Sequence, residues 1–242
     1  MKVYIQADHK GRPYNINAFS AMLGFEQMGF QTILFSSLSE LETVAETNIV
    51  VGGVGWVKAF LEQREIRLKD IDYPMQLNMF YGREIWNTTT KELLSQKLEK
   101  PIFVKPKLGK QFNGFVYTSE RDLIGRITAS QNVEVYCSEV LKIEEEWRCF
   151  IKYGEILDIK RYAGRLGFCY DFELVKQMVE QYSKSPKGYA LDIGVTDQGK
   201  TVIIEINDGY SLGSYGLDSL LYAKLLSARW AEITGTEDKC DF

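Results

Sequence analysis

The sequence predicts an α/β (α+β) protein in which a small parallel α/β unit precedes a strand-rich region. Three observations predict this class. Strands alternate with helices up to about residue 61, the pattern fades between about residues 69 and 87, and strand-like segments dominate from residue 101 onward. Alternation of strands and helices is typical of a parallel sheet with crossover helices. We therefore expect two units, residues 1–85 and residues 86–242.

In the first unit we expect strands at residues 2–7, 31–36 and 49–53. A helix over residues 15–28 has its large apolar side chains at the spacing of one buried face. These are Phe19, Met22, Leu23, Phe25 and Met28. A second helix follows the third strand through Val57, Phe60 and Leu61.

The second unit is expected to begin with a helix at residues 88–98, capped by its threonines. Strands follow at residues 101–106, 115–118 and 133–141, with a helix at 120–128. An antiparallel hairpin of residues 146–151 and 155–162 turns at Tyr153-Gly154. Helices at residues 172–182 and 217–233 flank the last hairpin.

That last hairpin, within residues 189–208, carries two carboxylates and an amide. A turn at residues 197–200 brings Asp192 opposite Glu205, and Asn207 lies two residues beyond Glu205, on the same side of the strand. Such oxygen ligands suit Mg²⁺. The alternative is a surface strand whose acidic residues face water. The dense apolar run at 203–206 favours burial, where a carboxylate needs a partner or a metal.

Three cationic side chains also interrupt apolar strands: Lys105, Arg148 and Lys160. Each on its own is compatible with a strand residue whose charged end reaches water. Together they favour a polyphosphate site, because Mg²⁺ usually completes its shell with substrate phosphates, and phosphates need nearby cations. The basic turn around Gly109 and Gly114 adds backbone N–H groups for the same phosphates.

Composition excludes several classes of function. The chain has 29 basic and 33 acidic residues, a net charge of −4, so no bulk attraction to nucleic acid or an anionic membrane is expected. No apolar segment approaches a membrane span in length. The four cysteines are far apart, as in a reduced, cytoplasmic protein. The sequence has one histidine, His9, which excludes any mechanism that needs two histidines. We expect His9 in an exposed loop.

The order of the motifs resembles the ATP-grasp superfamily, and within it the R2K clade. The motifs are F-V-K-P at 103–106, K-x-F-x-G at 110–114, S-E-V-L at 138–141, E-W-R-x-F at 146–150, D-x-K at 158–160 and E-x-N at 205–207. The clade includes a eukaryotic cell-division-cycle protein that assists assembly of a translation initiation factor. The resemblance implies an ATP-grasp fold preceded by a small Rossmann-like unit, with subdomains at about 86–141 and 142–242. It also implies ATP and Mg²⁺ as cofactors.

The resemblance assigns a role to each motif. Lys105 and Lys110 would contact phosphate, Ser138, Glu139, Val140 and Leu141 would form the adenine-binding hinge, and Glu145 or Glu146 would hold the ribose. Arg148 and Lys160 would face the reacting phosphate, and Asp192, Glu205 and Asn207 would bind Mg²⁺. Many peptide-forming relatives carry an arginine where this chain has Ala190. Arg148 must then hold the acyl oxyanion.

The implied function is an ATP-dependent carboxylate–amine ligase that forms an acyl phosphate, acting on a peptide, a protein or an amino acid. The alternative is an ATP-binding assembly factor that clamps a protein partner without ligation. A nucleotidyltransferase that forms an adenylated lysine is disfavoured, because the sequence has no K-x-D-G motif. The sequence leaves the oligomeric state and both substrates open.

Overall fold

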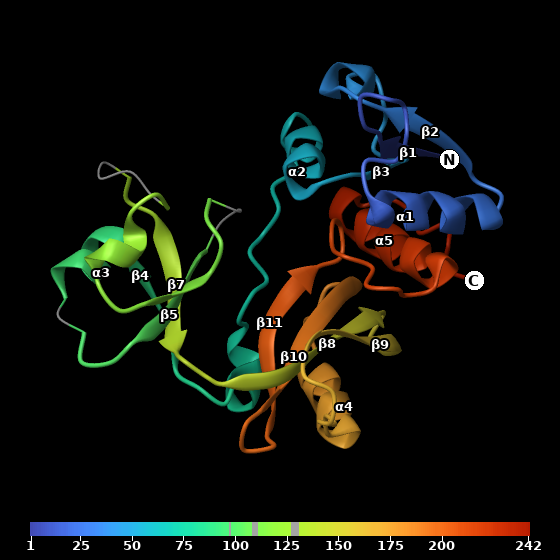
Figure 1. Cartoon of the computed structure of the whole chain (residues 1–242). Helices are drawn as coiled ribbons and strands as arrows, with labels where there is room; N and C mark the ends of the chain where they lie inside the picture. Colours follow the sequence, from blue (N-terminus) through green and yellow to red (C-terminus); the bar gives the residue numbers. More distant parts are fainter. Residues whose placement is uncertain (97, 108–110, 127–130) are drawn as a thin grey trace.

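The computed structural model describes residues 1–96, 98–107, 111–126 and 131–242, and its described part contains three sheets (Figure 1). The first sheet has the order β2-β1-β3 and is parallel throughout. Its strands are β1 (Lys2–Gln6), β2 (Gln31–Phe35) and β3 (Ile49–Val51). Helices α1 (Ile16–Gln27) and α2 (Val54–Glu62) follow β1 and β3. The predicted parallel α/β unit is therefore confirmed.

The buried face of α1 differs from the prediction. Its buried residues are Ala18, Ala21, Gly24 and Phe25, while Phe19 is 42% exposed. The reason is the close approach of α5 (Ser219–Thr234), which lies against α1 in Figure 1. A Cβ atom on Gly24 would lie 1.9 Å from the carbonyl oxygen of Ser219. Small residues are needed at this helix contact, so Phe19 turns outward, whereas Phe25 stays in the core.

The second sheet is antiparallel with the order β4-β7-β5-β6. Its strands are β4 (Ile85–Thr89), β5 (Ile102–Pro106), β6 (Phe115–Tyr117) and β7 (Glu134–Glu139). The predicted helix at 88–98 begins too early, because Thr88 and Thr89 pair with β7 and the helix, α3, is Thr90–Ser95. β-Branched threonines suit a strand. Thr89 still caps the helix, accepting from the Glu92 N–H.

The predicted helix at 120–128 is replaced, as far as the chain is described, by a short 3₁₀ turn, Glu120–Leu123. Gly125 has φ of +79°, a left-handed conformation that ends a helix. Residues 127 and 128 lie outside the described residues.

The third sheet is antiparallel with the order β11-β10-β8-β9, and it holds both predicted hairpins. Its strands are β8 (Ile143–Lys152), β9 (Glu155–Gly164), β10 (Gly188–Thr196) and β11 (Thr201–Asp208). Helix α4 (Phe172–Gln181) covers one face, where Leu191 and Ile193 belong to a core shared with α4. On the other face, Ala190 and Phe150 join the core built by the first sheet, α1 and α5. Asp192 of β10 and Arg148 of β8 lie on this second face, two residues from Ala190 and Phe150 along their strands.

The connection from α2 to β4 includes a 3₁₀ segment, Met75–Phe80, and passes between the second sheet and β11 (Figure 1). The predicted unit boundary at residues 85/86 falls at the start of β4. It stays a prediction, because α5 lies beyond the boundary in sequence and yet completes the core of the first sheet.

Candidate active site

The three predicted magnesium ligands converge on one face of the third sheet. Asp192 on β10 is the direct cross-strand partner of Glu205 on β11. The Asn207 amide nitrogen lies 3.0 Å from Asp192 Oδ2 and 3.2 Å from Glu205 Oε1. A register shift after Asp192 pairs Ile193 with Ile203, so one extra residue on β11 sets the phase of Glu205 and Asn207.

Arg148 holds Asp192 from the next strand. Its Nε and Nη2 atoms donate to the two carboxylate oxygens of Asp192, both at 2.7 Å, and both side chains are buried. Burial raises the pKa of Asp192 to about 6, even though Arg148 acts to lower it. Tyr215 lies over the guanidinium, with its ring centre 4.7 Å from Arg148 Cζ, and stacks on Tyr162. The guanidinium is thus fixed in orientation.

Lys105 reaches the same cluster from the second sheet. Its Nζ donates to Glu205 Oε2 at 2.8 Å and also pairs with Asp72. Burial alone would lower the pKa of Lys105. The two carboxylates outweigh this effect, so the pKa of Lys105 lies well above its usual value. Burial likewise acts to raise the pKa of Glu205, yet Lys105 lowers it overall. Lys105 is therefore an ammonium and Glu205 a carboxylate at neutral pH.

The donor set fits a magnesium ion. It offers two carboxylates and a carboxamide, whose oxygen takes the place of its nitrogen when the amide group is turned over. Within the described residues, no group of three or more His, Cys, Asp or Glu side chains is arranged to hold a metal. Mg²⁺ commonly binds through one or two carboxylates and completes its shell with phosphates and water. Asp192, Glu205 and Asn207 would hold it here.

Two cavities meet at these residues. One, of about 420 Å³, faces the second sheet and is lined by Lys105, Lys107, Glu205 and Asn207, among others. The other, of about 410 Å³, faces the first sheet and is lined by Arg148 together with Glu205 and Asn207. The acidic cluster therefore lies where a ligand on the lysine side could meet one on the arginine side.

The remaining predicted residues lie around this cluster or outside it. Lys160 on β9 is the cross-strand partner of Arg148 and forms an ion pair with Asp158 at 2.6 Å. It is absent from the described lining of both cavities. Lys110 lies outside the described residues.

The two candidate ribose ligands point to opposite faces of β8. Glu145 is buried, pairs with Arg161 and accepts from the Phe168 N–H at 3.1 Å. Glu146 lies two residues before Arg148 on the same strand face, and its side chain forms a hydrogen bond with that of Tyr162. Of the two, Glu146 shares the strand face of Arg148, whereas Glu145 forms its contacts away from the cluster.

The predicted hinge lies at the crossing from β7 to β8. Ser138 is buried and bonds Arg83 Nε at 3.3 Å, while Arg83 also donates to the carbonyls of Ile203 and Ile204 on β11. Glu139 pairs with Lys100, and Val140 is 45% exposed. Arg83 thus ties the hinge to the third sheet. Neither Ser138, Glu139, Val140 nor Leu141 is among the described lining residues of the two cavities.

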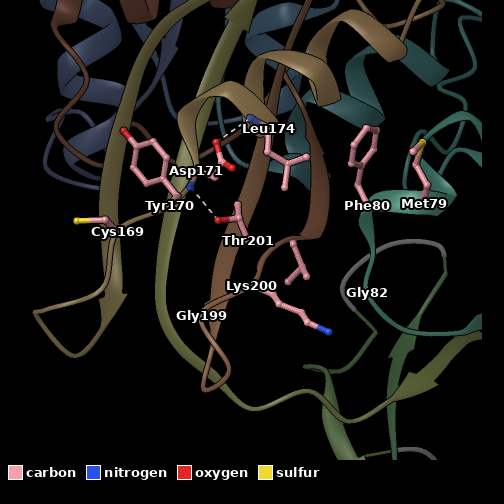
Figure 2. A pocket seen from close by; sticks show the side chains of 11 residues that line it. Met79, Phe80, Gly82, Cys169, Tyr170, Asp171, Leu174, Gly199, Lys200 and Thr201 are labelled. Carbon is pink, nitrogen blue, oxygen red and sulfur yellow. Dashed lines mark hydrogen bonds between the residues drawn. The ribbon is translucent and has the colours of Figure 1, made fainter.

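A third cavity, of about 470 Å³, lies on the α4 side of the third sheet (Figure 2). Its carboxylate, Asp171, is used structurally, since Oδ1 accepts from the Leu174 N–H at 3.0 Å as the N-cap of α4. The Asp171 N–H in turn donates to Thr201 Oγ1 at 2.9 Å. None of the predicted site residues lines this cavity within the described part of the chain.

Sequence reasoning missed the residues that the 66–85 connection brings to the cluster. Asp72 contacts Lys105, and Tyr73 lies with its ring centre 4.7 Å from the same ammonium. Periodicity gave no signal in this stretch. The spacing of Asp70 and Asp72 around Ile71, just before Pro74, is the one local feature that could have pointed to them.

The chain belongs to the R2K clade of the ATP-grasp superfamily: the model of the ATP-grasp domain, R2K clade family 2, matches residues 80–225. The fold and the resemblance inferred from the sequence are therefore confirmed. ATP-grasp enzymes use ATP, and Mg²⁺ is typical of the fold. A search of curated proteins finds none that matches this sequence.

Solved structures share the fold at low identity. D-alanine–D-alanine ligase from Bacillus anthracis, complexed with ATP, has 15% identity and a TM-score of 0.56, covering 96% of this chain and 94% of that one. N5-carboxyaminoimidazole synthetase from Staphylococcus aureus has 12% identity and a TM-score of 0.62, with coverages of 98% and 77%. The ATP-grasp ligase PsnB, complexed with a minimal precursor, has 13% identity and a TM-score of 0.54, with coverages of 93% and 98%. In the described part of this chain, no helix has the length and apolar character to cross a membrane.

Proposed function

We propose that this protein is an ATP-dependent carboxylate–amine ligase that uses Mg²⁺ and forms an acyl phosphate. The observation that carries the proposal is the convergence of cations and oxygen ligands from both sheets. Lys105 from the second sheet and Arg148, Asp192, Glu205 and Asn207 from the third sheet lie within one hydrogen-bonded cluster. Phosphoryl transfer depends on such positioning and charge neutralisation and needs no protein nucleophile.

The cavity on the lysine side suits the triphosphate. Lys105 and Lys107 line it, and Gly114 contributes a stretch of backbone without a side chain. A Cβ atom on Gly114 would lie 2.5 Å from the Phe103 ring, so glycine is needed where this loop passes β5. When bound, Mg²⁺ would neutralise charge on the phosphate oxygens. Lys105 would donate to the same oxygens as a point charge.

The cavity on the arginine side suits the carboxylate substrate. A carboxylate oxygen would attack the γ-phosphorus and ADP would leave; an amine would then attack the acyl carbon, lose a proton and displace phosphate. Arg148 lines this cavity, and its bidentate pair with Asp192 holds it in one orientation. Arg148 could therefore hold the acyl oxygen. Many peptide-forming relatives use for this role an arginine at the position where this chain has Ala190. Preorganised donors aimed at developing charge are usually the largest catalytic contribution.

The loop after β11 closes that cavity through contacts with α1 and with the residue that follows β3. Ser211 donates to the Gly52 carbonyl at 2.7 Å, and Ser214 donates to Asn17 Oδ1 from its backbone N–H and its hydroxyl, both at 3.0 Å. The serines therefore join two units of the protein. Because the first sheet supplies part of the wall, we propose that it helps to select the substrate. PsnB, which shares the fold, is a ligase complexed with a precursor; a peptide, protein or amino acid is the proposed substrate class here.

Trapping the activated carboxylate with hydroxylamine tests the proposal. Purified protein is incubated with Mg-ATP, hydroxylamine and pools of amino acids or peptides, and hydroxamate and ADP are measured. The proposal predicts ADP release that depends on the carboxylate and yields an equal amount of hydroxamate. Tight ATP binding with no turnover on any pool would instead support a non-ligating assembly factor.

A further inference from the structure

Residues 70–73, called the strap below, bridge the two sheets that form the lysine-side cavity. Tyr136 on β7 donates its hydroxyl to Asp70 Oδ2 at 2.5 Å. Asp72 Oδ1 accepts from the Ile206 N–H on β11 at 3.0 Å, and its other oxygen pairs with Lys105 on β5. Because these contacts come from both sheets, the strap fixes their separation.

Tyr73 fills space between the sheets beside Lys105. Its ring centre lies 4.9 Å from that of Tyr136 and 5.5 Å from that of Tyr81, in edge-to-face contacts. Its backbone has φ of +51°, a left-handed conformation that is unfavourable for a bulky residue. Such strain persists where surrounding contacts over-determine it. The strap is therefore held by its contacts and not by local preference.

The charges around Lys105 are already balanced by protein carboxylates. Its ammonium contacts both Asp72 and Glu205, and all three line the cavity. A phosphate brought to Lys105 would meet the Asp72 carboxylate at the same ammonium. Two anionic groups there repel each other, and a buried carboxylate deprived of its cation is unfavourable. Phosphate and Asp72 therefore compete for one cation.

We propose that the strap is a built-in occupant of the nucleotide cleft, with Asp72 holding Lys105 in the place of a phosphate until nucleotide displaces it. This inference rests on the proposed function, in which nucleotide binds at Lys105, and it describes how binding at that site would be regulated. Asp72 acts on the nucleotide through Lys105, so it is a positioning residue. The strap follows α2, and Val54, the first residue of α2, lines both cavities. Residues 70–72 of the strap line the lysine-side cavity together with Val54, so their release would alter a wall that Val54 shares with the substrate cavity.

The variant Asp72→Asn tests the competition. It keeps an oxygen acceptor for the Ile206 N–H and removes one of the two carboxylate charges that Lys105 contacts. Calorimetric titration with a non-hydrolysable Mg-ATP analogue should show a Kd about tenfold lower than in the unaltered protein, within the range of ordinary site coupling. The control is Asp197→Asn, an exposed turn carboxylate 3.7 Å from Lys142, for which Kd should not change.

Hydrogen exchange of the unaltered protein gives a second measurement that needs no variant. Saturating analogue should increase exchange across residues 69–75 and lower it in β5 and β11. Unchanged exchange at residues 69–75 would overturn the proposed role of the strap but not nucleotide binding itself. A Kd for Asp72→Asn equal to or higher than that of the unaltered protein would do the same. Absence of nucleotide binding in both proteins overturns the proposed function together with the strap.

Discussion

Arg148 and Asp192 face each other on neighbouring strands and share two hydrogen bonds of 2.7 Å in a buried ion pair. The pair lies beside Glu205 and Asn207, where the two cavities meet. It therefore serves the stability of the third sheet as well as the proposed chemistry. These two contributions can be separated by substitution.

Removal of one partner should destabilise the protein strongly. Asp192→Ala leaves the Arg148 guanidinium buried without its counter-ion, and breaking a buried pair in this way costs about 3–5 kcal/mol. The free energy of unfolding from urea denaturation should fall by that amount. Asp197→Ala, in an exposed turn, should change it by less than about 0.5 kcal/mol. A small effect of Asp192→Ala would contradict the described pairing.

Arg148→Lys should separate chemistry from folding. Lysine keeps the charge but cannot form the two parallel bonds of the guanidinium. We expect turnover to fall about 100-fold or more, as when one oxyanion donor is lost, while the affinity for Mg-ATP changes little. Turnover and nucleotide titrations on the same preparation check this. Unaltered turnover would exclude Arg148 from the reaction.

Reversal of charge at Lys105 should abolish nucleotide binding. Lys105→Glu would place a third carboxylate beside Asp72 and Glu205 and remove the cation that contacts both of them in the cavity. Calorimetric titration with Mg-ATP should then show no binding. The control is Lys200→Glu in the third cavity, which lies on the α4 side of the sheet (Figure 2) and should bind as the unaltered protein does. Retained affinity in Lys105→Glu would place the nucleotide elsewhere.

Thiol reactivity should distinguish the four cysteines. Burial raises the pKa of Cys137 and of Cys149 to about 12, whereas Cys169 is exposed. A thiol with a raised pKa stays protonated, so only a small thiolate fraction of Cys137 and Cys149 forms between pH 7 and pH 9. Cys240 is buried as well. An Ellman titration should show Cys169 reacting first and the three buried thiols reacting on unfolding. Fast reaction of Cys149 in the native state would contradict its burial.

The contact between α1 and α5 predicts a further effect on stability. Gly24→Ala would place a Cβ atom 1.9 Å from the Ser219 carbonyl oxygen, so the helices must move apart. Such overpacking costs about 1–3 kcal/mol. Gly55→Ala in α2 is the matched control, because no described atom lies within 4 Å of the added Cβ. It should stabilise the protein by about 0.5–1 kcal/mol through helix propensity, measured by thermal unfolding.

The sequence predicted the acidic cluster because its geometry is local. The two-residue period of a strand and the turn at residues 197–200 bring Asp192 close to Glu205. Their direct pairing also depends on the register shift between Asp192 and Ile193, for which the sequence carries no signal. The choice between Glu145 and Glu146 could not be made, because it depends on the pairing of β8 with β10 and on the position of the bulge in β9. Which of two adjacent strand residues faces the site is a tertiary property.

The strap could not be predicted for a different reason. Asp72 and Tyr73 belong to a connection without regular structure, and their contacts reach residues 33 and 134 positions away in Lys105 and Ile206. Periodicity carries no information about such segments. The exposed Phe19 has a related cause, since the small residues of α1 face a helix that lies at the far end of the sequence.

A crystal structure with Mg²⁺ and a non-hydrolysable ATP analogue tests the central claim most directly. The account predicts a metal bound by Asp192 and Glu205, phosphate oxygens on that metal, and Lys105 in contact with the same phosphates. A nucleotide bound away from this cluster, or a metal that touches neither carboxylate, would contradict it.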